Sequence, residues 1–167
     1  MKISIFFGLV FSFLFFGCKS ELKEEGVLVF NLNEYSEKEK SVFLEMNLDE
    51  NHPNLLDPNI NVETFEEVSN SWKKLHSDLY QFLKKNNFDW DSNSKNIKVF
   101  NKIYFTSEGK IKVYAFRILS DISKAKNIEY EALIKEFTKS IRINIERDFN
   151  FAQCGKASFP NVKIKNQ

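Results

Sequence analysis

Two stretches of alternating apolar residues around one glycine turn constrain the fold of this chain most. The alternation runs over residues 97–105, stops at residues 107–110, and resumes over residues 111–119. A period of two residues is typical of a β-strand, and Gly109 can supply the positive φ that a tight turn requires. The pattern therefore predicts an antiparallel hairpin over residues 97–119.

The alternation also predicts how the side chains divide between the two faces of this hairpin. One face is expected to carry Ile97, Val99, Asn101, Ile103, Phe105, Ile111, Val113, Ala115, Arg117 and Leu119. The opposite face would carry aromatic residues, among them Phe100, Tyr104, Tyr114 and Phe116. Both faces are largely apolar in the middle. We expect helices to cover one of them and the aromatic face to meet a partner, a second layer or a small hydrophobic ligand.

Two further segments have the spacing of amphipathic helices. Over residues 64–87 the apolar residues are spaced 3, 4, 3, 4 and 3 apart from Phe65 to Phe82, and Thr64 with Glu67 has the form of a capping box. Residues 127–140 carry a second apolar stripe, and Asn127 can cap it. Both stripes predict helices that pack against a core.

The remaining segments predict shorter elements. Residues 27–32 and 141–146 have strand character, residues 156–164 fit a last edge strand, and residues 49–63 are expected to form a loop. Residues 36–48 remain open between a helix and a strand, because a capping box precedes an alternating pattern. We therefore predict an α+β fold over residues 27–167, a single domain with a mainly antiparallel sheet and two helices packed on one face.

The first 18 residues look like a targeting signal. Lys2 is followed by an apolar run without charge until Lys19, and the run is too short to span a bilayer comfortably. The run ends in Phe15-Phe16-Gly17-Cys18, which resembles the lipobox of bacterial lipoproteins. The resemblance implies cleavage after residue 17 and lipid on Cys18, although phenylalanines stand where the family has an aliphatic and a small residue.

This resemblance implies a location. Residues 18–26 would then be the lipidated cysteine and a charged tether, and the protein would be lipid-anchored in the bacterial cell envelope, at the periplasmic or outer surface of the outer membrane. A plain secretory peptide and an uncleaved anchor are the alternatives.

The composition excludes several functions. Lys and Arg number 24 against 23 Asp and Glu, a balance that disfavours nucleic acid as a partner. With two histidines, His52 and His76, and five glycines, the sequence shows no zinc pattern, no phosphate loop and no hydrolase motif. We therefore expect no metal or other cofactor, and we assign no catalytic residue.

One thiol is a candidate for chemistry. Once Cys18 carries lipid, Cys154 is the only free cysteine, and Gly155 and Lys156 follow it directly. A neighbouring lysine can lower the pKa of a thiol, so Cys154 is either a reactive thiol or a buried apolar residue.

The segment from Lys98 to Phe159 has a strand–turn–strand, then a helix, then an aromatic-containing strand. In this order it resembles the C-terminal domain of TonB-type proteins. The chain has only three prolines and so lacks the proline-rich spacer of that family. What the resemblance implies is the pairing of a partner's extended segment with an open sheet edge.

Three functional hypotheses follow. The first is a lipid-anchored binding or assembly module with an envelope protein as its partner. The second is a thiol-dependent envelope enzyme that uses Cys154. The third is a carrier of a small hydrophobic ligand on the aromatic face.

Overall fold

The computed structural model describes residues 26–57, 59 and 63–161. Cys18, the signal segment and most of the tether lie outside the described residues. The described residues form a four-stranded sheet and four helices, in the order β1 (Leu28–Asn31), α1 (Glu37–Glu45), α2 (Leu48–Asn51), α3 (Phe65–Lys85), β2 (Asn96–Phe105), β3 (Ile111–Ile118), α4 (Lys124–Phe137) and β4 (Phe151–Pro160). The α+β class and the single domain are confirmed.

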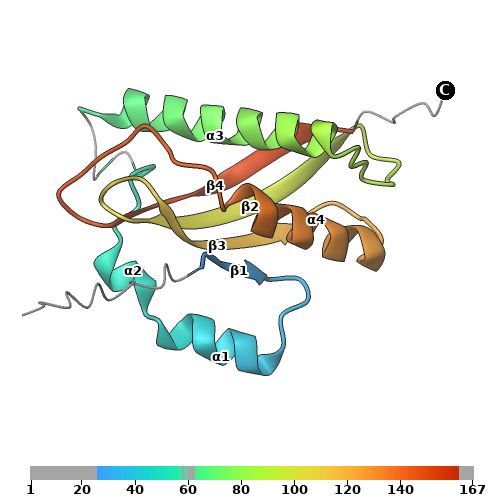
Figure 1. The fold of residues 1–167 in the computed structure, drawn as a ribbon, viewed down its shortest axis with the longest axis horizontal. Coiled ribbons are helices and arrows are strands. Elements are labelled where there is room, and N and C mark those ends of the chain that lie inside the picture. Colours follow the sequence, from blue (N-terminus) through green and yellow to red (C-terminus); the bar gives the residue numbers. More distant parts are fainter. Residues whose placement is uncertain (1–25, 58, 60–62, 162–167) are drawn as a thin grey trace, which may run out of the picture.

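The sheet has the strand order β1-β3-β2-β4. Strands β2 and β3 form the predicted antiparallel hairpin, and β4 pairs antiparallel with β2 as an edge strand. Strand β1 runs parallel to β3, so the sheet is mixed. Figure 1 shows α3 alongside β4 at the top of the view and α1 with α2 at the bottom, beside β1.

Helices cover both faces of the sheet. The larger core lies beneath α3 and α4, as predicted, and includes Leu75, Leu79, Tyr130 and Ile134. On the other face, α1 and the start of α2 bring Phe43, Met46 and Leu48 against a smaller cluster around Phe30 and Tyr104. No helix of the described part of the chain is long and apolar enough to cross a bilayer.

The segment left open is a helix. Ser36 accepts a hydrogen bond from the Glu39 amide (3.2 Å), and the Glu39 carboxylate accepts one from the Ser36 amide (2.7 Å), which completes the capping box. Val42 and Leu44, which suggested a strand, are exposed on this helix. The prediction of a loop over residues 49–63 was wrong at its start, because residues 49–51 belong to helix α2.

The predicted starts of two elements and one predicted strand were also wrong. Helix α4 begins three residues earlier than predicted, because Ser123 and not Asn127 caps it. Residues 141–146 form no strand and contribute one isolated bridge, between Lys110 and Arg142. Strand β4 begins at Phe151, five residues before the prediction, and therefore includes Cys154.

The predicted division of the hairpin faces was wrong, and a β-bulge is the reason. Tyr104 pairs with Val113, and Phe105 pairs with Ile111, so Lys112 is an extra residue on β3. The extra residue reverses the alternation of β3 relative to β2. Tyr114 is thereby opposite Ile103, in the core beneath the helices, and not on the aromatic face.

Candidate functional site

A groove runs between α3 and the edge strand β4. It consists of two adjoining depressions of about 340 and 240 Å³, which share Tyr80 and Pro160. We call it the α3–β4 groove. Its lining residues are Trp72, Lys73, His76, Ser77, Tyr80, Leu83, Lys84 and Asn87 from α3 and its end, Phe88 and Trp90 from the following segment, and Lys156–Pro160 from β4.

The helical wall of the groove is a row of every fourth residue. Trp72, His76, Tyr80 and Lys84 lie one turn apart on α3, so their side chains form a continuous ridge. The Trp72 and His76 rings lie 4.1 Å apart between centroids, and the Lys84 ammonium lies 5.8 Å from the centre of the Tyr80 ring. The three rings are partly exposed, so they can contact a bound molecule.

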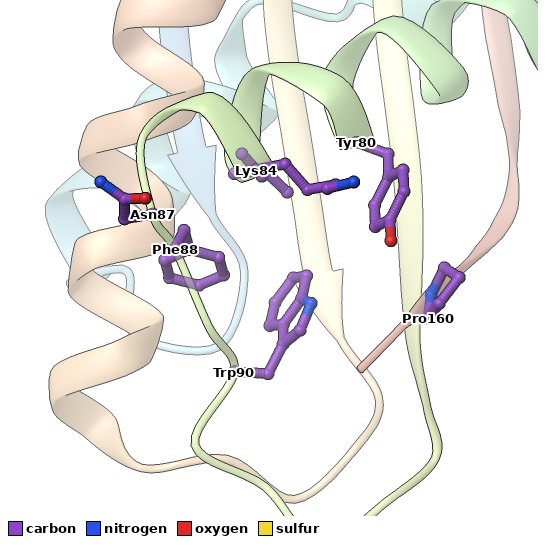
Figure 2. A pocket seen from close by; sticks show the side chains of 7 residues that line it. Tyr80, Lys84, Asn87, Phe88, Trp90 and Pro160 are labelled. Atoms are coloured by element: carbon purple, nitrogen blue, oxygen red, sulfur yellow. The ribbon is translucent and has the colours of Figure 1, made fainter. Parts of the chain in front are cut away.

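The far end of the groove is aromatic. Figure 2 shows the Trp90 indole between the turn after α3 and Pro160, with Tyr80 and Lys84 on the helix beside it. The Phe88 and Trp90 rings meet edge to face, with their centroids 4.9 Å apart. Both are buried, so they form a rigid end wall.

The other wall of the groove is the open edge of β4. On β2, the Lys98 carbonyl accepts a hydrogen bond from the Leu119 amide, and the Lys98 N–H donates one to the Ser120 hydroxyl. Both backbone groups of Lys98 therefore point away from β4. Its partner across the sheet is Ser158. By the alternation of an antiparallel ladder, the N–H and C=O of Ser158 and of Lys156 point outward.

The same edge is covered farther back along the strand. The Ala152 amide donates to the Pro53 carbonyl (2.9 Å), and the Ala152 carbonyl accepts from the Leu55 amide (2.9 Å). The Cys154 amide donates to the Asn54 side chain (3.2 Å). The open part of the edge therefore begins after Cys154 and ends at Pro160, which has no N–H to offer.

His76 ties the groove to the core. Its Nδ1 lies 2.9 Å from the Trp72 carbonyl oxygen, and its Nε2 lies 3.0 Å from the Asn101 amide nitrogen. The carbonyl can only accept and the amide can only donate, so His76 carries its proton on Nδ1. Burial lowers the pKa of His76 to about 4, which leaves it neutral at pH 7.

The network continues inward from Asn101. This amide is fully buried, and its carbonyl oxygen accepts a hydrogen bond from the Tyr114 hydroxyl (3.1 Å). Burial raises the pKa of Tyr114 above its usual range. Because both ring nitrogens of His76 are engaged, His76 serves as a fixed wall of the groove and not as a free base.

Cys154 lies on the opposite face of the sheet from this network. It pairs across the ladder with Lys102, whose ammonium contacts the Asp49 carboxylate at 2.6 Å. Burial raises the pKa of the Cys154 thiol, although Lys102 opposes this effect. The cation beside the thiol is therefore Lys102 and not the predicted Lys156, and its effect on the pKa of the thiol is outweighed by burial.

The four residues of the predicted aromatic face are divided between the two faces. Tyr114 and Phe116 are fully buried beneath α3 and α4. Phe100 and Tyr104 lie on the other face, where the Tyr104 hydroxyl donates to Asp49 (2.9 Å) and Phe100 pairs between Arg117 and Lys156. They share no common surface.

Two findings concern the wider molecule. Within residues 26–57, 59 and 63–161, no three His, Cys, Asp or Glu side chains gather so that they could hold a metal ion.

Comparison of the chain with protein families, with curated proteins and with solved structures found no match.

Proposed function

We propose that this protein is a lipid-anchored binding module of the bacterial cell envelope. It would bind an extended segment of a partner protein in the α3–β4 groove. The observation that carries this proposal is the open edge of β4 at Lys156 and Ser158, which faces the aromatic ridge of Trp72, His76 and Tyr80. Edge groups supply main-chain hydrogen bonds to an added strand, and the ridge supplies apolar contacts.

The arrangement favours binding over catalysis. The neutral His76 has both ring nitrogens engaged, and the raised pKa of Cys154 lowers its thiolate fraction. The ligand-carrier hypothesis required a common aromatic face, and the bulge divides it. An open strand edge is otherwise a liability for aggregation, so a partner that covers it would also protect the protein.

The anchor is the second part of the proposal. Cys18 would carry lipid, and residues 19–26 would tether the domain to the outer membrane. Mass spectrometry of the mature amino terminus tests this part, with Cys18→Ala as the control. An amino terminus at Cys18 with acyl chains is expected, whereas a chain that begins at Met1 would contradict the anchor.

Photocrosslinking in cells tests the binding part. A photoreactive residue at Lys73, on the rim of the groove, is expected to give a discrete adduct, and one at Lys40 on α1 is not. The adduct should disappear with Ser158→Pro, which removes the outward N–H, and persist with Ser158→Ala, which keeps it. Adducts of equal yield at both positions would contradict docking in the groove.

A further inference from the structure

The charged residues that line the α3–β4 groove are all positive. Lys73, Lys84 and Lys156 line it, and no Asp or Glu belongs to the lining. All three lysines are exposed, and within the described residues none of them forms an ion pair. By contrast, the neighbouring Lys74 is paired with Asp78 at 2.8 Å. The groove therefore offers a local positive potential to whatever it binds.

The register of β4 determines which side of an added strand meets which surface. Ala157 and Phe159 are on the face beneath α3, whereas Lys156 and Ser158 project to the other face. Side chains of an added strand also alternate between the faces. Every second residue of a bound segment would therefore contact the aromatic ridge, and the residues between them would lie next to Lys156.

We infer, resting on the proposed function, that the bound segment alternates apolar residues with aspartate or glutamate. The apolar residues would enter the groove against Trp72, Tyr80 and Phe159. An acidic residue opposite Lys156 would form a cross-strand pair, and Lys73 and Lys84, which lie on α3 on the other side of the added strand, would attract it through the local positive potential. The open edge from Lys156 to Pro160 has room for a segment of about five to seven residues at roughly 3.3 Å per residue.

Tryptophan, tyrosine and lysine also occur together at surfaces that contact lipid headgroups. The β4 edge argues against this use of the groove. The outward main-chain groups of Lys156 and Ser158 present N–H donors and C=O acceptors at the spacing of a β-strand, which a polypeptide strand matches and a layer of lipid headgroups does not. A polypeptide strand provides both the hydrogen bonds and the carboxylates.

Selection from a displayed library of random heptapeptides tests the inference. The detergent-solubilised full chain serves as bait, and Ser158→Pro serves as the bait for counter-selection. Ser158→Ala is the matched control, since it changes the side chain and keeps the N–H. Enriched peptides should alternate apolar with acidic residues, should be lost on the Ser158→Pro bait and should bind the Ser158→Ala protein as well as the wild type.

Charge reversal makes the test quantitative. With Lys156→Glu, the selected acidic peptides should bind at least tenfold more weakly, and versions with lysine in place of the acidic residues should bind more tightly than to the wild type. Acidic peptides should also lose affinity as the salt concentration rises.

The outcomes separate this inference from the function on which it rests. Peptides that depend on the Ser158 N–H but show no acidic preference would overturn the inference and leave the docking edge standing. If no selected peptide depends on that N–H, both fail. Binding of the chain without its acyl groups to phosphatidylglycerol vesicles, abolished by Lys73→Glu and Lys156→Glu, would assign the lysines to a lipid surface and overturn the inference.

Discussion

Asn101 in the middle of the sheet donates a hydrogen bond to Nε2 of His76 in the groove wall, over 3.0 Å. Asn101 is fully buried, whereas His76 borders the groove. The position of the aromatic ridge is therefore fixed by a polar contact with the core, and not only by apolar packing. A groove with such a rigid wall loses little conformational entropy on binding.

Removing the side-chain amide of Asn101 should destabilise the folded protein. We expect Asn101→Leu to lower the free energy of unfolding by about 2–4 kcal/mol, because His76 Nε2 and the Tyr114 hydroxyl would both lose the side-chain amide as a hydrogen-bond partner. Tyr114→Phe should cost about 1 kcal/mol in the wild type and almost nothing in the Asn101→Leu background. Urea unfolding of the four proteins measures both values. Additive effects of the two substitutions would contradict the network.

The lowered pKa of His76 predicts a pH dependence of stability. The folded pKa of about 4 lies below the ordinary value of 6.5, so the unfolded chain binds the proton more tightly. The contribution of neutral His76 to the free energy of unfolding is complete above pH 6.5. It is lost as the pH falls toward 4, by roughly 3 kcal/mol in total. Unfolding free energies measured across this range should show a smaller slope in His76→Gln.

His52 does not affect the comparison of wild type with His76→Gln. Its pKa is also lowered, mainly by burial, so it contributes in the same direction, and it is present in both proteins. The difference between the two profiles therefore reports on His76 alone. Parallel profiles would mean that His76 titrates normally.

The turn of the hairpin depends on Gly109. Its φ is +79°, and a Cβ there would lie 2.7 Å from the carbonyl oxygens of both Ile143 and Ile145. We expect Gly109→Ala to destabilise the protein by about 2–4 kcal/mol. Gly26→Ala is the matched control, because a Cβ at that position meets nothing within 4 Å, and it should be neutral. Thermal unfolding compares the two, and equal melting temperatures would contradict the close approach.

Cys154 should be a slow nucleophile. Burial raises its pKa, so less thiolate is present at pH 7.5. In a Cys18→Ser background, Cys154 is expected to react with iodoacetamide roughly tenfold or more slowly than a cysteine at the exposed position 158, introduced by Ser158→Cys with Cys154→Ala. Faster labelling of Cys154 would restore the thiol-enzyme hypothesis.

Local sequence patterns predicted the elements that depend on nearest neighbours along the chain. The apolar spacing of residues 64–87 predicted α3 to within two residues at its ends, and the alternation around Gly109 predicted the hairpin. The prediction for residues 141–146 failed because alternation alone does not supply a partner strand. The place beside β2 is taken by β4, through Phe151–Pro160.

The candidate site was less accessible from the sequence. Trp72, His76, Tyr80 and Lys84 are visible as an every-fourth row, yet nothing in the sequence places β4 beneath them. The face assignment failed at the bulge, since one extra residue, Lys112, exchanges the faces of Tyr114 and Phe116. A groove between a helix that ends at Lys85 and a strand that begins at Phe151 is a property of the tertiary fold.

Amide hydrogen exchange at Lys156 and Ser158 distinguishes an open β4 edge from one that a partner strand covers. It would be measured on the lipidated protein in native membranes and on the same protein purified alone in detergent. We predict rapid exchange at both amides in the purified protein and strong protection in the membranes, where a partner strand covers the edge. Slow exchange in the purified protein, or equally fast exchange in both, would contradict it.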